Sequence, residues 1–246
     1  MKIGAIVQTR MGSTRLPGKV MLDLCGKPVT RHVIERLKNS SFLDEIIIAT
    51  TTLKRDGVIA EQAEKGGVKW FCGSEDDVLS RYYYAARENA LDIVVRITSD
   101  CPLIDPGILD DVIDVFVNNN YILVTNAGND LAQRTFPRGL DVEVFSFNAL
   151  EDAFNNGQKS YHREHVTPYL YETYPKNIYY FKNDIDYSNY RWTLDTEEDY
   201  ELISMVYERL YNKYGDGFGM AEILELMKSE PKLGRINAHV QQKQLI

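Results

Sequence analysis

The amino-acid sequence predicts a three-layer α/β fold with a mainly parallel central sheet. Short runs of β-branched and other apolar residues recur along the chain, and continuous runs of this kind suit strands that are buried on both faces. Amphipathic helical patterns separate these runs, as expected where helices cover a parallel sheet. A chain of 246 residues is also long enough to bury one substantial core.

Six segments are predicted to be strands, in the order 3–7, 46–50, 68–71, 93–97, 122–125 and 141–145. The first four are mainly apolar runs, so we expect them to be buried on both faces, and 122–125 is a fifth candidate. The last, Asp141–Phe145, alternates polar and apolar residues. This alternation predicts a half-exposed or edge strand.

The predicted helices begin after Pro28, at about Glu75, at Pro106 and after Thr196. Proline is favoured in the first turn of a helix, and an apolar stripe follows both Pro28 and Pro106. Ser74 and Asp77 resemble a capping box, which would open the second of these helices. Beyond Gly234 the sequence predicts an exposed arm.

Charge and hydropathy narrow the class of protein. The chain holds 28 Lys and Arg residues against 36 Asp and Glu residues, a net charge of −8. This acidic balance argues against a protein that binds nucleic acid. No apolar run approaches the ~18 residues of a membrane span, so we expect no membrane insertion. The first run, 3–7, is too short for the core of a secretory leader, which predicts a cytoplasmic protein.

A cationic loop follows the first predicted strand. The segment from Gln8 to Arg31 holds five basic residues against one acidic residue, a local net charge of +4. Gly12, Ser13 and Thr14 offer backbone N–H groups and hydroxyls that, together with flexible cations, can wrap a polyphosphate. Val20 follows Lys19 where a P-loop would have a hydroxyl for magnesium, so this is not a P-loop. The alternative is a solvated loop whose glycines and prolines only form turns.

Two aspartates could lie at the same sheet edge as this loop. Asp100 follows the predicted strand 93–97, and Asp195 precedes the helix that begins after Thr196. Two carboxylates would repel a triphosphate unless a magnesium ion lay between them. The ordinary alternatives are that Asp100 anchors a turn and that Asp195 helps to cap the helix.

Six sequence blocks, in order, resemble those of CTP-dependent sugar nucleotidyltransferases. They are QTRMGSTRLPGKVMLDLCGKPV from Gln8, GSEDDVLSRY from Gly73, RITSDCPLID from Arg96, FPRGLDVEVF from Phe136, REHVTPY from Arg163 and RWTLDTEEDYELI from Arg191. The chain is similar to CMP-3-deoxy-manno-octulosonate synthetases and resembles more closely the spore-coat polysaccharide biosynthesis cytidylyltransferases. The resemblance implies a GT-A-like nucleotidyltransferase sandwich over residues 1–246, with a nucleotide-binding half at about 1–130 and an acceptor-binding half at about 131–246. It also implies a homodimer.

The implied reaction is attack by an acceptor oxygen on the α-phosphorus of CTP, with release of pyrophosphate. The resemblance implies that Asp100 and Asp195 bind Mg²⁺ and that Arg10, Arg15 and Lys19 act on the phosphates; these five form the expected catalytic set. The expected nucleotide-binding residues are Gln8, Arg10, Gly12, Ser13, Arg15, Lys19, Gly73, Ser74, Asp77 and Arg96. Ser74 could instead be only a helix cap, and Arg96 could instead form a structural ion pair.

The second half of the chain is expected to bind a small polar acceptor. Its candidate residues form two polar sets, Arg138, Asp141 and Glu143, and Arg163, Glu164 and His165. His165 could be a general base or a structural histidine. Two other functions stay open: a GT-A-type glycosyltransferase that uses a nucleotide sugar, and a non-catalytic nucleotide-binding protein. The segment around Asp100 lacks the DxD motif expected of the glycosyltransferase.

Overall fold

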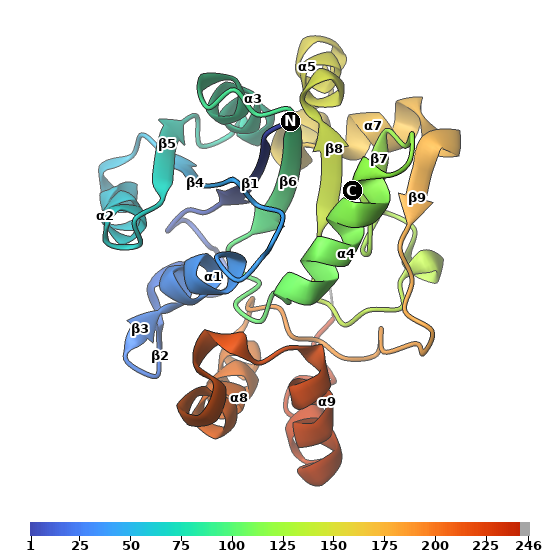
Figure 1. Cartoon of the computed structure of the whole chain (residues 1–246). Helices are drawn as coiled ribbons and strands as arrows, with labels where there is room; N and C mark the ends of the chain where they lie inside the picture. The colour runs from blue at the N-terminus through green and yellow to red at the C-terminus, as the bar shows by residue number, and fades with distance from the viewer. Residues whose placement is uncertain (242–246) are drawn as a thin grey trace.

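The computed structural model describes residues 1–241 and contains a seven-stranded mixed sheet in the order β5-β4-β1-β6-β8-β7-β9 (Figure 1). Its strands are β1 (Ile3–Gln8), β4 (Glu45–Thr51), β5 (Lys69–Gly73), β6 (Ile93–Thr98), β7 (Leu123–Thr125), β8 (Glu143–Ser146) and β9 (Ile178–Tyr180). Neighbours among β5, β4, β1 and β6 are parallel, whereas β8 runs antiparallel to β6 and β7. The predicted class, an α/β fold with a mainly parallel sheet, is confirmed. A small hairpin of β2 (Asp23–Leu24) and β3 (Lys27–Pro28) lies outside this sheet.

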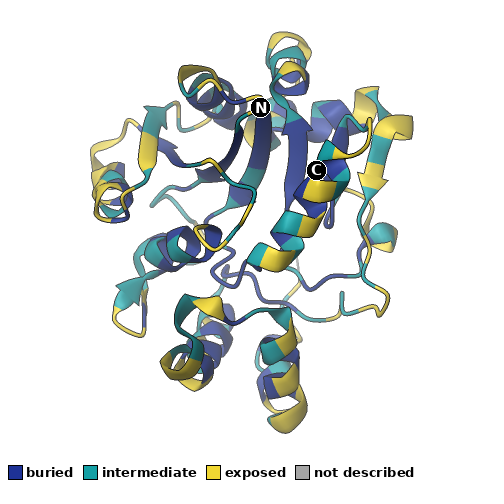
Figure 2. Cartoon of the chain, in the orientation of Figure 1, coloured by how far each residue is buried: buried dark blue, intermediate teal, exposed yellow. Residues whose placement is uncertain are grey.

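Helices cover both faces of the sheet, which gives the three layers. The helices are α1 (Val29–Leu37), α2 (Gly57–Lys65), α3 (Val78–Glu88), α4 (Pro106–Val117), α5 (Phe147–Asn156), α6 (Ser160–His165), α7 (Pro168–Thr173), α8 (Glu197–Tyr214) and α9 (Met220–Ser229). Apolar side chains of α1, α2 and α4 pack on one face, and those of α3, α5 and α7 pack on the other. Figure 2 shows the central strands buried between helices whose outer sides are exposed.

A third apolar cluster lies beyond the sheet. Helices α8 and α9 pack there against Trp192, Leu140 and Leu103, and Figure 1 shows both helices away from the strands. Thr196 caps α8 as predicted: its hydroxyl accepts a hydrogen bond from the N–H of Asp199 at 3.3 Å. Because Trp192 and Thr196 flank Asp195, this cluster fixes the chain that carries one of the two candidate aspartates.

The prediction of an edge strand at Asp141–Phe145 is wrong. Strand β8 lies between β6 and β7, and its residues Glu143, Val144 and Phe145 are buried. The alternating pattern arises because the carboxylate of Glu143 is buried in an ion pair with Arg96, not because one face meets water. A buried charge satisfied by a partner is indistinguishable, by pattern alone, from a solvated one.

The expectation that the strand at 68–71 is buried on both faces is also wrong. Strand β5 lies at the edge of the sheet, and its residues Lys69 and Trp70 are exposed.

Two further predictions need correction. Helix α3 begins at Val78 and not at Glu75, because the carboxylate of Asp77 caps it by accepting the N–H of Ser80 at 2.9 Å. The hydroxyl of Ser74 accepts the N–H of Asp77 in the preceding turn. The predicted exposed arm after Gly234 is also wrong in part, because Asn237 is buried; residues 242–246 lie outside the described residues.

Helix α1 ties the third cluster to the sheet through two fully buried side chains. His32 Nδ1 lies 2.6 Å from Asp216 Oδ1, and its Nε2 lies 2.7 Å from the carbonyl oxygen of Leu24. Arg36 donates to the carbonyl oxygens of Ile104 at 2.7 Å and Phe218 at 2.5 Å. Both ring nitrogens of His32 therefore face hydrogen-bond acceptors, one on Asp216 and one on the backbone of Leu24.

This junction is expected to weaken in acid. Burial raises the pKa of Asp216, but the hydrogen bond and charge of His32, with the charge of Lys27, outweigh it and lower the pKa below its ordinary 3.8. A carboxyl group whose pKa is lowered by folding stabilises the fold above its unfolded-state pKa, and this contribution is lost as the pH falls through the folded-state pKa. When the pH is lowered from about 5 to about 3, the unfolding free energy of the Asp216→Asn variant should therefore decrease by less than that of the unchanged protein. Urea denaturation measures this, with exposed Asp23→Asn as the control; equal slopes for Asp216→Asn and the unchanged protein would contradict it.

Candidate active site

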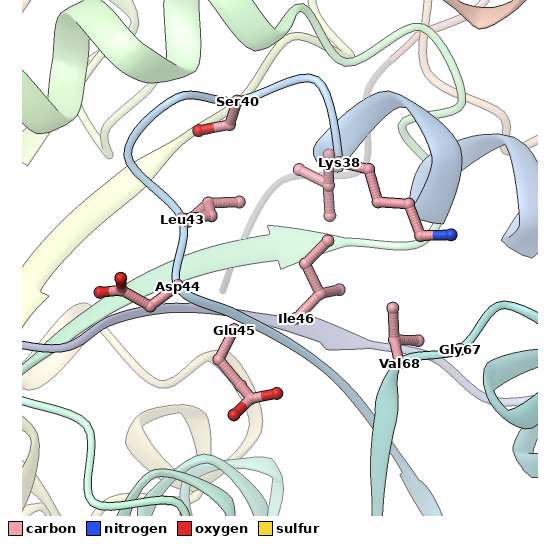
Figure 3. A pocket seen from close by; sticks show the side chains of 9 residues that line it. Lys38, Ser40, Leu43, Asp44, Glu45, Ile46, Gly67 and Val68 are labelled. Atoms are coloured by element: carbon pink, nitrogen blue, oxygen red, sulfur yellow. The ribbon is translucent and has the colours of Figure 1, made fainter.

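A cavity of about 690 Å³ opens beside the carboxyl ends of β1 and β6. Strand register explains the position, because Gln8 and Thr98, the last residues of these strands, are paired partners. Eight of the predicted site residues line it, namely Gln8, Arg96, Asp100, Arg138, Asp141, Glu143, His165 and Asp195. A smaller hollow of about 240 Å³ lies at the amino end of β4, beside Asp44, Glu45 and Ile46 (Figure 3). None of the predicted site residues lines it.

Lys19 joins the two candidate aspartates. Its Nζ lies 3.0 Å from Asp100 Oδ2 and 2.7 Å from Asp195 Oδ1, and it also donates to the carbonyl oxygen of Leu194 at 2.7 Å. Burial lowers the pKa of Lys19, but the charges of the two carboxylates outweigh it and raise the pKa. Burial likewise raises the pKa of Asp100, whereas the charge of Lys19 and a hydrogen bond from Thr98 lower it. The arrangement thus favours the charged forms of Lys19 and Asp100.

Asp195 has two further cationic neighbours. Arg15 Nη2 lies 2.9 Å and Arg191 Nη2 lies 3.3 Å from Asp195 Oδ2. The structure therefore brings together four residues of the expected catalytic set, Arg15, Lys19, Asp100 and Asp195, from three separate parts of the chain. It pairs the expected phosphate-binding cations with the expected metal-binding carboxylates.

A second loop, which the sequence reasoning missed, supports the cationic one. Asp56, fully buried after β4, accepts the N–H of Met11 at 2.7 Å and the hydroxyl of Thr51. Arg55 and Arg10 both pair with Glu75, Arg10 at 3.6 Å. The sequence could have indicated this loop by its position after a predicted buried strand, because parallel strands end at a common edge of the sheet.

The loop glycines of the nucleotide-binding set are tightly enclosed. A Cβ atom at Gly12 would lie 2.9 Å from Arg55 Nη2, and one at Gly73 would lie 2.7 Å from Arg81 Cγ. Ser13 donates its N–H to the carbonyl oxygen of Met11 at 2.9 Å, which tightens the turn. Larger residues at Gly12 or Gly73 would therefore displace arginine side chains next to the loop.

One predicted acceptor-binding set divides in the structure. His165 lines the cavity, but Arg163 and Glu164 do not. Arg163 donates to Asp77 Oδ2, at 3.0 Å from its Nε, and to the carbonyl oxygen of Phe154 at 2.9 Å. It therefore links α6 to the cap of α3, and Glu164 is exposed. Asp77 caps α3 and does not line the cavity either.

The other set has its acidic members paired. Glu143 contacts Arg96 Nη1 at 2.6 Å, and it accepts the hydroxyls of Thr167 at 3.0 Å and Tyr171 at 2.8 Å. Asp141 forms a two-pronged ion pair with Arg134 at 2.7 and 3.0 Å. Arg96 thus forms the structural ion pair that the sequence left open, and it also lines the cavity.

Arg138 differs from the other arginines that line the cavity. Within residues 1–241, Arg96 and Arg134 each pair with a carboxylate, whereas the guanidinium of Arg138 forms no ion pair within 4.0 Å. Burial lowers the pKa of Arg138, and the nearby charge of Arg134 lowers it further. This cation is available to an anionic or hydroxyl group of a ligand.

We predict that Glu143→Gln destabilises the fold, because the buried guanidinium of Arg96 loses its countercharge. Removing one partner of a buried ion pair costs about 3–5 kcal/mol of unfolding free energy. Because a glutamine can still accept hydrogen bonds, we expect a loss of about 3 kcal/mol. Urea denaturation at neutral pH measures the change. Glu164→Gln, at an exposed carboxylate, is the control and should change the unfolding free energy by less than about 0.5 kcal/mol. A loss below about 1 kcal/mol for Glu143→Gln would contradict the prediction.

Comparison with known proteins shows the family to which the chain belongs. The family model described as "Cytidylyltransferase" matches residues 4–226. The chain therefore belongs to the cytidylyltransferase family, as the sequence blocks indicated.

Three similar proteins illustrate the range of this relationship. A cytidylyltransferase from Leptospira borgpetersenii has a solved structure with a TM-score of 0.89, is 37% identical, and aligns over 99% of both chains. The spore coat polysaccharide biosynthesis protein SpsF of Bacillus subtilis is 30% identical over 92% of this chain and 94% of its own. A CMP:2-keto-3-deoxy-manno-octonic acid synthetase shares the fold, with a TM-score of 0.66 and 17% identity over 85% of this chain and 99% of its own. Among residues 1–241, no helix is both long enough and apolar enough to cross a membrane.

Proposed function

We propose that this protein transfers CMP from CTP to an oxygen of a sugar or related polar acceptor and releases pyrophosphate, in the synthesis of a surface polysaccharide or glycan. The convergence of Arg15, Lys19, Asp100 and Asp195 beside a large cavity carries the proposal. The family relation supports the use of CTP, and the likeness to a spore coat polysaccharide biosynthesis protein supports the pathway class.

Such a reaction depends on positioning and on neutralising charge more than on a covalent intermediate. In the proposed complex, Arg10, Arg15 and Lys19 exchange their carboxylate partners for phosphate oxygens of CTP. Gly12 and Ser13 lie in the same loop as these cations, and the N–H of Gly12 and the hydroxyl of Ser13 add hydrogen-bond donors. The cavity beyond Asp100 then holds the acceptor, with its attacking oxygen directed at the α-phosphorus.

A magnesium ion fits the residues that are present. Asp100 and Asp195 supply oxygen ligands to a common point, now occupied by the ammonium of Lys19. No group of three His, Cys, Asp or Glu residues within 1–241 is arranged to hold a metal alone. This suits Mg²⁺, which is usually bound by one or two carboxylates and completed by substrate phosphates and water. When bound, it would neutralise charge on the transferred phosphate.

The acceptor side of the proposal uses Arg138, Asp141 and His165, which line the cavity. We propose that Arg138 binds a polar or anionic group of the acceptor and that His165 accepts the proton of the attacking hydroxyl. Glu143 orients this wall through Arg96 and Thr167. The family resemblance further supports a homodimeric enzyme, and the net charge of −8 supports the absence of a nucleic-acid partner.

The first test is a panel of CTP, UTP, GTP and ATP, each with and without magnesium, in thermal unfolding. A ligand at 100 times its dissociation constant stabilises the fold by about 2.7 kcal/mol. CTP with magnesium should stabilise the protein most, and pyrophosphate release should follow with a suitable sugar or sugar-acid acceptor. Stabilisation by a nucleotide sugar alone would favour a glycosyltransferase, and binding of CTP without turnover across a broad acceptor panel would favour a nucleotide-binding protein.

We predict that Lys19→Met weakens the fold in the absence of metal and increases its response to metal. Removing the ammonium leaves Asp100 and Asp195 short of one buried cation, which costs about 2–4 kcal/mol of unfolding free energy. Millimolar MgCl₂ should restore more stability to this variant than to the unchanged protein, because no ammonium has to be displaced. Urea denaturation with EDTA or MgCl₂ measures both effects.

Lys38→Met, at a lysine that pairs with Glu35 on the surface of α1, is the matched control for this test. It should change neither the stability nor the response to magnesium. An equal gain from magnesium in Lys19→Met and in the unchanged protein would contradict the placement of the metal.

A further inference from the structure

The segment after the last short helix, η6 (Leu233–Arg235), reaches the back of the active site. Asn237 in this segment is only 2% exposed. Its side-chain amide donates to the carbonyl oxygen of Arg191 at 2.8 Å and to Asp199 Oδ1 at 2.8 Å. Both hydrogens of one amide group therefore join the chain before Asp195 to the helix after it.

Asp199 is the centre of this contact. It is fully buried in the first turn of α8, and its carboxylate accepts the backbone N–H groups of Asp195 and Thr196, each at 3.0 Å. It also accepts Nε and Nη2 of Arg191 at 2.8 and 2.9 Å. A buried carboxylate that collects this many donors fixes the turn on which Asp195 lies.

Arg191 carries this restraint to the carboxylate of Asp195. Its Nη2 contacts Asp199 Oδ2 at 2.9 Å and Asp195 Oδ2 at 3.3 Å, so one guanidinium edge spans both groups. The same stretch of chain is bonded to the acceptor side of the cavity, where Trp192 donates its N–H to the carbonyl oxygen of Arg138 at 2.7 Å. A shift of the Arg191 backbone would therefore move Asp195 and the neighbourhood of Arg138 together.

We infer that Asn237 is a positioning residue of the active site, which holds the Asp195 carboxylate in place through Arg191 and Asp199. This inference rests on the proposed function, because it takes Asp195 as a metal ligand. Asn237 itself does not line the cavity, so it touches neither nucleotide nor acceptor there. Groups that orient a metal-binding carboxylate from behind commonly change metal affinity or activity by about 10- to 100-fold when they are removed.

The test uses Asn237→Leu, which is close to asparagine in shape but donates no hydrogen bond. Mn²⁺ replaces Mg²⁺ as the probe, and electron paramagnetic resonance measures its binding to the full chain with saturating CTP. We expect Mn²⁺ affinity to fall about 10-fold and kcat for pyrophosphate release to fall similarly, with the KM for CTP changed less than about 2-fold. His239→Ala, at an exposed residue of the same segment, should change none of these values.

A double variant separates positioning from mere stabilisation. In an Asp195→Asn background, Asn237→Leu should lower Mn²⁺ affinity no further, because its effect on the metal passes through Asp195. It should still lower the unfolding free energy of this background. If Asn237→Leu does not fold, Asn237→Ala, which is smaller and also donates no hydrogen bond from its side chain, takes its place. An unchanged Mn²⁺ affinity in the folded variant overturns the inference alone. Failure of the unchanged protein to bind CTP with Mn²⁺ overturns the proposed function and this inference with it.

Discussion

The contact of Lys19 with Asp100 and Asp195 is the interaction on which the rest of the site depends. It joins the loop after β1, the loop after β6 and the turn before α8 at one buried point. Separate carboxylates in this position would repel each other and lose hydration, so the ammonium stabilises the buried carboxylate of Asp195 and the half-buried one of Asp100. The fold therefore assembles its site around an internal charge balance that a bound nucleotide and metal would have to replace.

The same principle extends along the cationic loop. Arg10 pairs with Glu75 and Arg15 with Asp195, so the cations expected to bind phosphate are already held by carboxylates. Arg10 and Arg15 are more exposed than Lys19, and exposed pairs contribute little stability. Exchange of partners should thus be easiest at Arg10 and Arg15 and hardest at Lys19. If the site binds CTP as proposed, this ordering would let the triphosphate enter before the buried ion cluster rearranges.

Local sequence patterns predict the alternation of strands and helices, but they do not predict which charged side chains are buried. Apolar runs and caps correctly predicted β1, β4 and the start of α8, because periodicity and side-chain capping act within a few residues. The interior position of Glu143 depends on Arg96, which lies 47 residues away in sequence. Pairing over such distances leaves no local pattern, so β8 was predicted as an edge strand.

The candidate site shows the same division. Asp100, Asp195 and Lys19 could be proposed from the sequence, because each follows or precedes a regular element at the sheet edge. Asp56 and Asn237 could not be, because their importance lies in the backbone groups that they bind, Met11 N–H and the carbonyl oxygen of Arg191. Residues that receive a substrate must be polar and accessible, whereas residues that hold them need only a buried partner. Physical reading of a sequence therefore finds the first kind more readily, and the structure is needed to find the second.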